Sequence, residues 1–142
     1  MAILLKSIPV LPFLWITVNS IFMRMNKNHI TGRQGEEIAA SWLIQHGFTV
    51  LHRNWRYSHY ELDIVAVKGE VLHLIEVKTR ICIAFGHPLE SITQQKLKRM
   101  MEAGEAYQIQ NPDSVRVQYD LIGISVLRGG DYVLAYEEDL SL

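Results

Sequence analysis

Asp63, Glu76 and Lys78 are the residues of this sequence best suited to chemistry. Two carboxylates held side by side repel one another unless a positive charge lies between them. A hard divalent cation meets that need, because Mg²⁺ binds in proteins through one or two carboxylates, with water and phosphate oxygens as further ligands. An ammonium group beside such an ion could hold an attacking water or stabilise negative charge that develops on a phosphate. The residue types therefore indicate magnesium-dependent chemistry at a phosphate.

The hairpin that carries these residues decides whether they meet. Runs rich in apolar residues predict strands over residues 60–67 and 71–79, separated by Gly69-Glu70 as a two-residue turn. Glycine in the first central position suits a type II′ turn, so Lys68 should pair with Val71. The turn residues therefore predict the register of the two strands.

In this register Asp63 lies directly opposite Glu76, and Glu61 lies opposite Lys78. Lys78 shares the face of Glu76, because side chains two positions apart in a strand point the same way. A second interpretation stays open, in which these are charged residues of a solvated strand end and Glu61 forms an ion pair with Lys78. A loop one residue longer or shorter would remove the Asp63–Glu76 pairing, so a structure tests it directly.

The elements around the hairpin follow from capping residues and periodicity. Thr31 and Gln34 form a capping box that opens a helix, which Gly47 terminates. Ser91 and Gln94 form a second capping box for a helix that runs to about residue 108. Further strands are expected over residues 48–55, 115–127 and 132–136. The resulting order, αβββαββ, predicts an α/β domain of the α+β, mixed-sheet kind.

Composition limits the function classes. The chain has 142 residues, of which 49% are hydrophobic and 20% charged, as is ordinary for one globular domain. The net charge is −1, so binding of duplex DNA by bulk charge is excluded and nucleic-acid binding must rely on a local patch. The lone cysteine, Cys82, excludes an internal disulfide and a cysteine-based zinc site, and it fits a reducing compartment.

Residues 1–25 form a largely apolar segment that we set apart from a domain over residues 26–142. The uncharged run at residues 7–23 is at the short edge for a membrane span, and a signal peptide would need a small-x-small cleavage site that the segment lacks. We favour a mis-assigned start, with Met23 or Met25 as the first residue, because the domain behind the segment reads as complete. We therefore expect a cytoplasmic protein without stable membrane association, unless residues 1–25 are translated.

A wider pattern of motifs surrounds the three site residues. Asp63 followed by Glu76-Val77-Lys78 resembles the PD-(D/E)xK nuclease motif without its proline. Other blocks fall in order over about residues 29–125: Gly32-x-x-Gly35-Glu36-x-x-Ala39, Arg53-Asn54-Trp55-Arg56, Glu61-Leu62-Asp63-Ile64, Glu76-Val77-Lys78-Thr79-Arg80, Phe85-Gly86-x-Pro88, Lys96 and Tyr119-Asp120. Together they resemble the YraN family, small uncharacterised bacterial proteins related to archaeal Holliday-junction resolvases and to the restriction-endonuclease-like superfamily.

The resemblance implies a restriction-endonuclease-like core and a role for each matching residue. Asp63 and Glu76 would ligate Mg²⁺ or Mn²⁺, aided by the backbone carbonyl of Val77. Lys78 would position the attacking water or stabilise charge. Glu36 on the first helix would join the site as a further catalytic carboxylate, although an acid in the first turn also complements the helix dipole. Resolvase relatives act as dimers on DNA, so DNA and a second copy of the chain are the expected partners.

The candidate contacts to nucleic acid lie close to the predicted site: Arg53, Arg56, Arg80, Lys96 and Gln95. A charged solvated surface is the ordinary alternative explanation for such residues. Two polar residues elsewhere have structural interpretations. His73 is expected on the apolar face of the hairpin, and Asp120 is expected either to pair with Arg116 on its own strand or to serve function.

Three functions therefore stay open. The first is a Mg²⁺-dependent phosphodiesterase acting on DNA, in particular on branched or otherwise structured DNA. The second is a non-catalytic nucleic-acid-binding module that keeps the fold and the metal site, which the neutral charge favours. The third is an interaction protein with a relic site.

Overall fold

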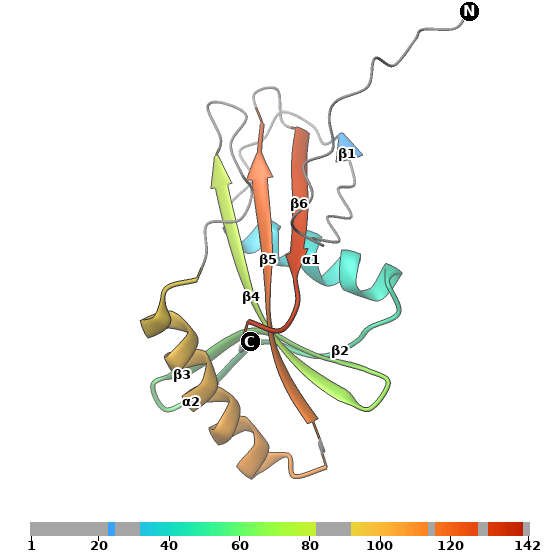
Figure 1. The fold of residues 1–142 in the computed structure, drawn as a ribbon. Helices are drawn as coiled ribbons and strands as arrows, with labels where there is room; N and C mark the ends of the chain where they lie inside the picture. The colour runs from blue at the N-terminus through green and yellow to red at the C-terminus, as the bar shows by residue number, and fades with distance from the viewer. Residues whose placement is uncertain (1–22, 25–31, 82–91, 114–115, 128–130, 141–142) are drawn as a thin grey trace, which may run out of the picture.

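Among the described residues, six strands form one mixed sheet in the order β1-β6-β5-β4-β3-β2, and two helices accompany it (Figure 1). The computed structural model describes residues 23–24, 32–81, 92–113, 116–127 and 131–140. The predicted αβββαββ order of a mixed α/β domain is confirmed, and a short strand precedes it. In chain order the elements are β1 (Met23–Arg24), α1 (Gly32–Gln45), β2 (Thr49–Tyr57), β3 (Tyr60–Lys68), β4 (Val71–Ile81), α2 (Gln94–Gln110), β5 (Arg116–Val126) and β6 (Asp131–Glu137).

The short strand β1 lies within residues 1–25, the segment that we set apart from the domain. It pairs antiparallel with β6, through Met23↔Tyr132 and Arg24↔Asp131. The backbone at residues 23–24 is therefore part of the sheet, at its outer edge.

The sheet combines antiparallel hairpins with one parallel pair. β3 runs antiparallel to both β2 and β4, and β6 runs antiparallel to β5. β5 lies parallel to β4, from Val71↔Arg116 to Ile81↔Val126. A parallel pair needs a crossover connection, and α2 lies within the segment that joins these two strands.

The helices cover opposite faces of the sheet, as Figure 1 shows. Leu43 of α1 packs in one buried cluster with Ile64 and Ile75. Met100 of α2 packs in the other cluster with Val65. Adjacent residues of β3 belong to different clusters because side chains alternate along a strand. The sheet is thus buried on both faces.

The predicted hairpin register is confirmed. Lys68 pairs with Val71 across the turn, and the pairing continues in the same register to Ile64↔Ile75. Gly69 has φ +61°, the left-handed conformation that the first central position of a type II′ turn requires and that glycine adopts most readily.

The β3–β4 ladder ends one residue pair before the predicted carboxylates. Its last pair is Ile64↔Ile75. Beyond this point β4 stays paired with β5 as far as Ile81, whereas β3 stays paired with β2. The two strands therefore diverge where Asp63 and Glu76 lie, and Figure 1 shows this separation. The split opens a place for side chains in the middle of the sheet.

The start of α2 differs from the prediction. Thr93 is the N-cap, and its hydroxyl accepts a hydrogen bond from the backbone N–H of Lys96 at 3.2 Å. The predicted cap, Ser91, lies outside the described residues, as does Thr31 before α1. The helix thus begins at Gln94, which places Lys96 in the first turn.

Gly35 lets α1 approach the sheet closely. A Cβ atom built there would overlap Thr79 Oγ1 and would lie 3.1 Å from Thr79 Cβ, so Thr79 would have to move. We expect Gly35→Ala to lower the free energy of unfolding by roughly 1–3 kcal/mol, as overpacking usually does. Urea denaturation measures this, with Gly32→Ala as the matched control because a Cβ at Gly32 has nothing within 4 Å. Equal stability of the two variants would contradict the tight contact.

No helix in the described part of the chain is long and apolar enough to cross a membrane. Residues 1–22, Cys82 and the block Phe85-Gly86-x-Pro88 lie outside the described ranges.

Candidate metal and phosphate site

The carboxylate of Asp63 lies where β3 and β4 separate. Its Oδ2 accepts a hydrogen bond from the backbone N–H of Val77, with an N···O distance of 2.8 Å. A side chain of one strand thereby binds the backbone of the other just past the last ladder pair. The structure thus ties Val77 to Asp63 through its N–H, and the predicted role of the Val77 carbonyl stays a prediction.

Burial raises the pKa of Asp63 from 3.8 to about 7. The negative charge of Glu76 is the second cause, and that of Glu36 adds a smaller rise. The Val77 N–H and the Lys96 ammonium act in the opposite direction. A carboxyl group with so high a pKa marks a place where negative charge is both desolvated and crowded. The negative charges of Glu76 and Glu36 therefore both act on the Asp63 carboxyl group.

Lys96 provides the positive charge next to these carboxylates. Its Nζ lies 2.9 Å from Glu76 Oε2, and the Glu76 side chain is only 12% exposed. The first turn of α2 positions this lysine, because the helix begins directly after Thr93. We predicted Lys96 as a phosphate contact on the rim, and the structure places it against the carboxylates themselves. An ammonium group here balances part of the charge that a metal ion would balance.

Glu36 reaches the site from α1 and is held by Asn54. Asn54 Nδ2 donates a hydrogen bond to Glu36 Oε2 at 2.7 Å. Asn54 has φ +51° within β2, a conformation that asparagine adopts more readily than most residues. It lies between the pairs Arg53↔Ile64 and Trp55↔Leu62, which is also the level of Asp63 on β3. An irregular strand residue thus orients the third carboxylate.

Lys78 lies two residues beyond Glu76 on β4 and is half-buried, level with Gly123 of β5. It shares the strand face of Glu76 by alternation. Within the described residues, its ammonium group forms no ion pair, and Glu61 instead pairs with Arg56 at 2.8 Å. The predicted cross-strand proximity of Glu61 and Lys78 is therefore not realised, because β3 and β4 have already separated at that level.

The other predicted nucleic-acid contacts lie on the surface around the site. Arg53 is exposed and lines a shallow surface recess together with Glu36 and Asn54. Arg56 is 70% exposed in its ion pair with Glu61. Two more exposed residues lie on β4 and on the first turn of α2: Arg80 and Gln95.

The oxygen atoms available at this site are of the kind that binds a hard divalent cation. Asp63 and Glu76 supply carboxylate oxygens from two strands, and Mg²⁺ is commonly held by one or two carboxylates with water and phosphate. The described ranges contain no group of three or more His, Cys, Asp or Glu side chains close enough to form a complete metal cluster. A metal ion at this place would therefore need ligands from water or from a bound phosphate.

His73 lies on the predicted apolar face of the hairpin, where its ring meets Phe48, and it also makes a buried polar contact there. Its Nδ1 lies 2.6 Å from Asp120 Oδ2, and both side chains are buried. Asp120 therefore pairs with His73 in place of the predicted pair with Arg116, which is exposed. The parallel register brings the two residues together, because His73 pairs with Gln118 and Ile75 with Asp120 on neighbouring strands.

Asn54 and the placement of Lys96 are what sequence reasoning missed at the site. Asn54 was present in a motif block, and its tolerance of positive φ is the only local signal that could have singled it out. Lys96 was found by its position in the pattern, but its contact with Glu76 depends on where α2 begins.

Comparisons with known proteins identify relatives across most of the chain. A family model described as "Uncharacterised protein family UPF0102" matches residues 35–124. A UPF0102 protein of Prosthecochloris aestuarii is 40% identical over 97 residues, which are 68% of this chain and 76% of that one. A UPF0102 protein of Clavibacter michiganensis subsp. michiganensis is 39% identical over 107 residues, which are 75% of this chain and 91% of that one.

A solved structure also shows a distant likeness. It is that of Pyrococcus furiosus SfsA in complex with Ca²⁺, with 14% identity and a TM-score of 0.36. The matched region covers 76% of this chain and 62% of that chain. At that TM-score the likeness supports no functional argument.

Proposed function

The chain belongs to the uncharacterised protein family UPF0102, and on that premise we propose that it is a nucleic-acid-binding protein of the endonuclease-like kind, which cleaves phosphodiester bonds in structured DNA with the aid of Mg²⁺ or Mn²⁺. The observation that carries the proposal is the buried Asp63 carboxylate beside Glu76 where β3 and β4 diverge: burial, and after it the negative charge of Glu76, raises the pKa of Asp63 to about 7. Carboxylates desolvated in this way favour a bound cation. The motif that supplies them resembles the nuclease pattern, although it lacks the proline of that pattern.

The residues divide the work as follows. Asp63 and Glu76 would hold the divalent ion, which when bound polarises a phosphate oxygen and lowers the pKa of water. The Val77 N–H fixes the orientation of the Asp63 carboxylate. Asn54 fixes that of Glu36. Each acid is thereby held in place before any substrate arrives, and such preorganisation is what a catalytic site needs.

The two lysines have different tasks. Lys78 is half-buried on the same strand face as Glu76, so it would hold the attacking water or balance charge that develops on the phosphate. Lys96 is paired with Glu76 at 2.9 Å and 38% exposed. If Glu76 held the cation, the Lys96 ammonium would be free to contact a phosphate oxygen. This is consistent with its predicted place among the nucleic-acid contacts.

A second function, a binding module without catalysis, is favoured by one observation. The Lys96–Glu76 ion pair already neutralises one of the two main carboxylates, and among the described residues Glu36 does not complete a three-carboxylate metal cluster with Asp63 and Glu76. A protein that uses the site only to bind nucleic acid would retain this ion pair permanently.

A cleavage assay with matched variants separates the two functions. The purified full chain is incubated with Mn²⁺ or Mg²⁺ and four-way, duplex or single-stranded DNA, or RNA. We expect cleavage of a structured DNA, and we expect Glu76→Gln to reduce its rate by roughly a hundredfold or more, because a metal ligand is lost. Glu70→Gln is the control, since Glu70 is exposed at the turn of the same hairpin.

The outcomes are distinct. Equal cleavage rates in wild type and Glu76→Gln would refute the catalytic role of the site. Binding of DNA in a gel-shift assay, without cleavage under any of these conditions, would favour the binding module. If calorimetry finds no binding of Mg²⁺ or Mn²⁺ by the wild type, the metal site is wrong for the catalytic protein and for the binding module alike.

A further inference from the structure

A cavity of about 380 Å³ lies on the α1 face of the sheet, away from the carboxylate site. Its lining comes from α1, from the start of β2, from the β3–β4 hairpin and from β5 and β6. The site residue Asp63 is two positions from Val65, which packs in the α2 cluster, and therefore belongs to the opposite face. Pockets of this size accommodate small ligands. The cavity thus needs an explanation separate from the proposed nuclease site.

A fully buried carboxylate holds three of the side chains that line this cavity. Asp120 has no exposed surface. Its Oδ2 lies 2.6 Å from His73 Nδ1 and 2.7 Å from the Tyr136 hydroxyl, which donates to it. Its Oδ1 accepts from Gln118 Nε2 at 3.0 Å. A network of this kind fixes side chains in one arrangement, which is the preorganisation that small-ligand sites show.

Aromatic rings form much of the remaining wall. The rings of Trp42 and His46 are stacked, with centroids 3.8 Å apart, and Phe48 meets Tyr136 edge to face at 6.0 Å. Trp42 Nε1 is buried and has no hydrogen-bond partner among the described residues. Flat, polarisable walls suit a flat ring, which gains more from stacking on them than an aliphatic group does. The occupant should therefore be planar and should carry polar edge atoms.

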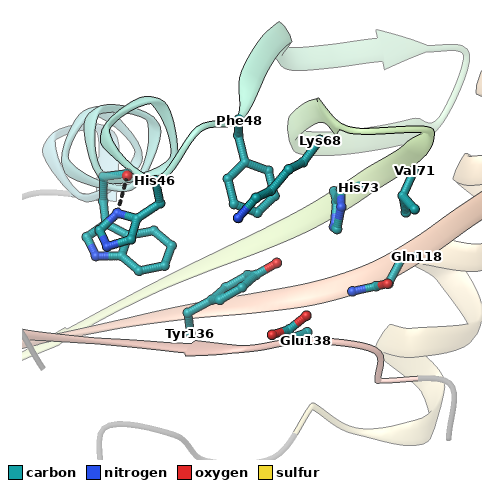
Figure 2. A pocket seen from close by; sticks show the side chains of 9 residues that line it. His46, Phe48, Lys68, Val71, His73, Gln118, Tyr136 and Glu138 are labelled. Carbon is teal, nitrogen blue, oxygen red and sulfur yellow. Dashed lines mark hydrogen bonds between the residues drawn. The ribbon is translucent and has the colours of Figure 1, made fainter. Parts of the chain in front are cut away.

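Two opposite charges border the cavity. Lys68 Nζ lies 4.7 Å from the centroid of the Phe48 ring, and Glu138 is exposed on the far side (Figure 2). Figure 2 shows Gln118, Tyr136 and Glu138 across the cavity from Phe48 and Lys68. The lysine can take an anionic group, and the carboxylate can accept hydrogen bonds from an amino group.

We propose that this cavity binds a nucleobase that bears an exocyclic amino group, with its phosphate held by Lys68. The base ring lies between the aromatic walls, and stacking of a base on aromatic rings is a strong and common contact. Glu138 accepts from the amino group, as acidic side chains do from cytosine. Gln118 donates one amide N–H to Asp120 and lines the cavity, so its side-chain amide can also bond to the base edge.

The base can come from two sources, a free nucleotide or an unstacked base in a nucleic-acid strand. Both present the same ring and phosphate to the cavity. A strand would join this pocket to the proposed nucleic-acid-binding function, whereas a free nucleotide would make the pocket a separate ligand site. The inference itself does not rest on the cleavage activity.

Calorimetric titration of the full chain with CMP, UMP and ribose 5-phosphate tests the proposal. We expect CMP to bind about tenfold more tightly than UMP, because uracil has no amino group for Glu138. Lys68→Met should weaken CMP about tenfold, and Glu138→Gln should reduce the preference for CMP over UMP. Both side chains are exposed, so neither change threatens folding. Lys98→Met, an exposed lysine of α2, is the matched control.

A cytosine-containing single strand and a uracil-containing single strand form the second arm. If only the single strand binds, and its binding depends on Lys68, the ligand is a base within a polymer. If CMP binds, and its binding depends on Lys68, the ligand is a free nucleotide. The proposal is overturned if no Lys68-dependent binding of either appears, if ribose 5-phosphate binds as tightly as CMP, or if CMP and UMP bind equally. Glu76→Gln should bind CMP like the wild type, so failure of the nuclease proposal is distinguishable.

Discussion

Replacing Asp120 with alanine is expected to lower the free energy of unfolding by about 3–5 kcal/mol, as removal of one partner from a buried polar network does. The carboxylate accepts from His73, Gln118 and Tyr136, and also from the backbone N–H of Asp139 at 3.0 Å. Alanine leaves all of these groups in a buried place without their acceptor. Domains of this size are stable by only about 5–15 kcal/mol, so the change takes away a large share.

The control for this experiment is Asp113→Ala, since Asp113 is exposed just after α2 and should matter by no more than about 0.5 kcal/mol. Urea denaturation followed by circular dichroism gives the midpoint and slope of both transitions. Aggregation of the Asp120 variant during expression agrees with the expectation. Unfolding of both variants at the wild-type midpoint would show that the network contributes nothing to stability.

Turn chemistry made the hairpin predictable from sequence. Glycine at position 69 indicated a type II′ turn. That turn type predicted the pairing of Lys68 with Val71. That register is local information, because it depends on four consecutive residues. It placed Asp63 and Glu76 close together, and the electrostatic effect of Glu76 on Asp63 shows that they are near enough to interact.

The divergence of β3 and β4 was not predictable in the same way. It depends on β4 pairing with β5 up to Ile81, and β5 lies more than thirty residues further along the chain. Because the strands separate, Asp63 bonds to the Val77 backbone, and the expected neighbours Glu61 and Lys78 do not meet. The local sequence pattern of β4 cannot show whether this strand stays paired with β3 or with β5.

The positions of Lys96 and Asp120 also depend on distant packing. A helix that begins after Thr93 turns Lys96 toward Glu76. A capping box at residue 91 carried no such information. Asp120 meets His73 across a parallel pair whose register no turn determines, since parallel strands are joined by a long crossover. Buried polar networks of this kind are therefore the part of the structure that sequence reasoning reached least well.

Under the proposed function, the arrangement would let a nearly neutral protein bind phosphates. Its net charge of −1 gives no general attraction for nucleic acid. Individual lysines instead carry positive charge at particular sites. Lys96 and Lys78 lie on the helix turn and the strand face of the carboxylate site, and Lys68 lies next to the cavity on the other face of the sheet. Local charge of this kind provides orientation rather than bulk affinity.

Asp63→Asn should make the apo protein more stable at pH 8 and should remove part of the pH dependence of its stability. The amide oxygen of asparagine can still accept the hydrogen bond from Val77, while the negative charge beside Glu76 disappears. In the wild type the pKa of Asp63 is about 7 in the folded state against 3.8 for an unperturbed group, so the folded state binds this proton more tightly. The stability that it contributes is fully present below pH 3.8 and is lost as the pH rises through 7.

The difference in stability between the two proteins isolates this single group from every other ionisable group of the chain. We expect wild type to lose roughly 2–4 kcal/mol relative to Asp63→Asn between about pH 4 and pH 8, given about 1.4 kcal/mol for each unit of pKa shift and some screening by solvent. Thermal unfolding at a series of pH values measures the loss as several degrees of Tm. Asp113→Asn is the control, because its carboxylate is exposed.

Divalent cations should stabilise the protein through the same carboxyl group, but with the opposite dependence on pH. Protons and Mg²⁺ compete for the Asp63 carboxylate, so stabilisation of wild type by Mg²⁺ or Mn²⁺ should be largest at pH 8 and small at pH 5.5. Asp63→Asn should gain little from the metal at either pH. A wild type whose Tm falls no more steeply with pH than that of Asp63→Asn would show that Asp63 is not perturbed. A metal effect that is equal at both pH values would show that the cation binds elsewhere.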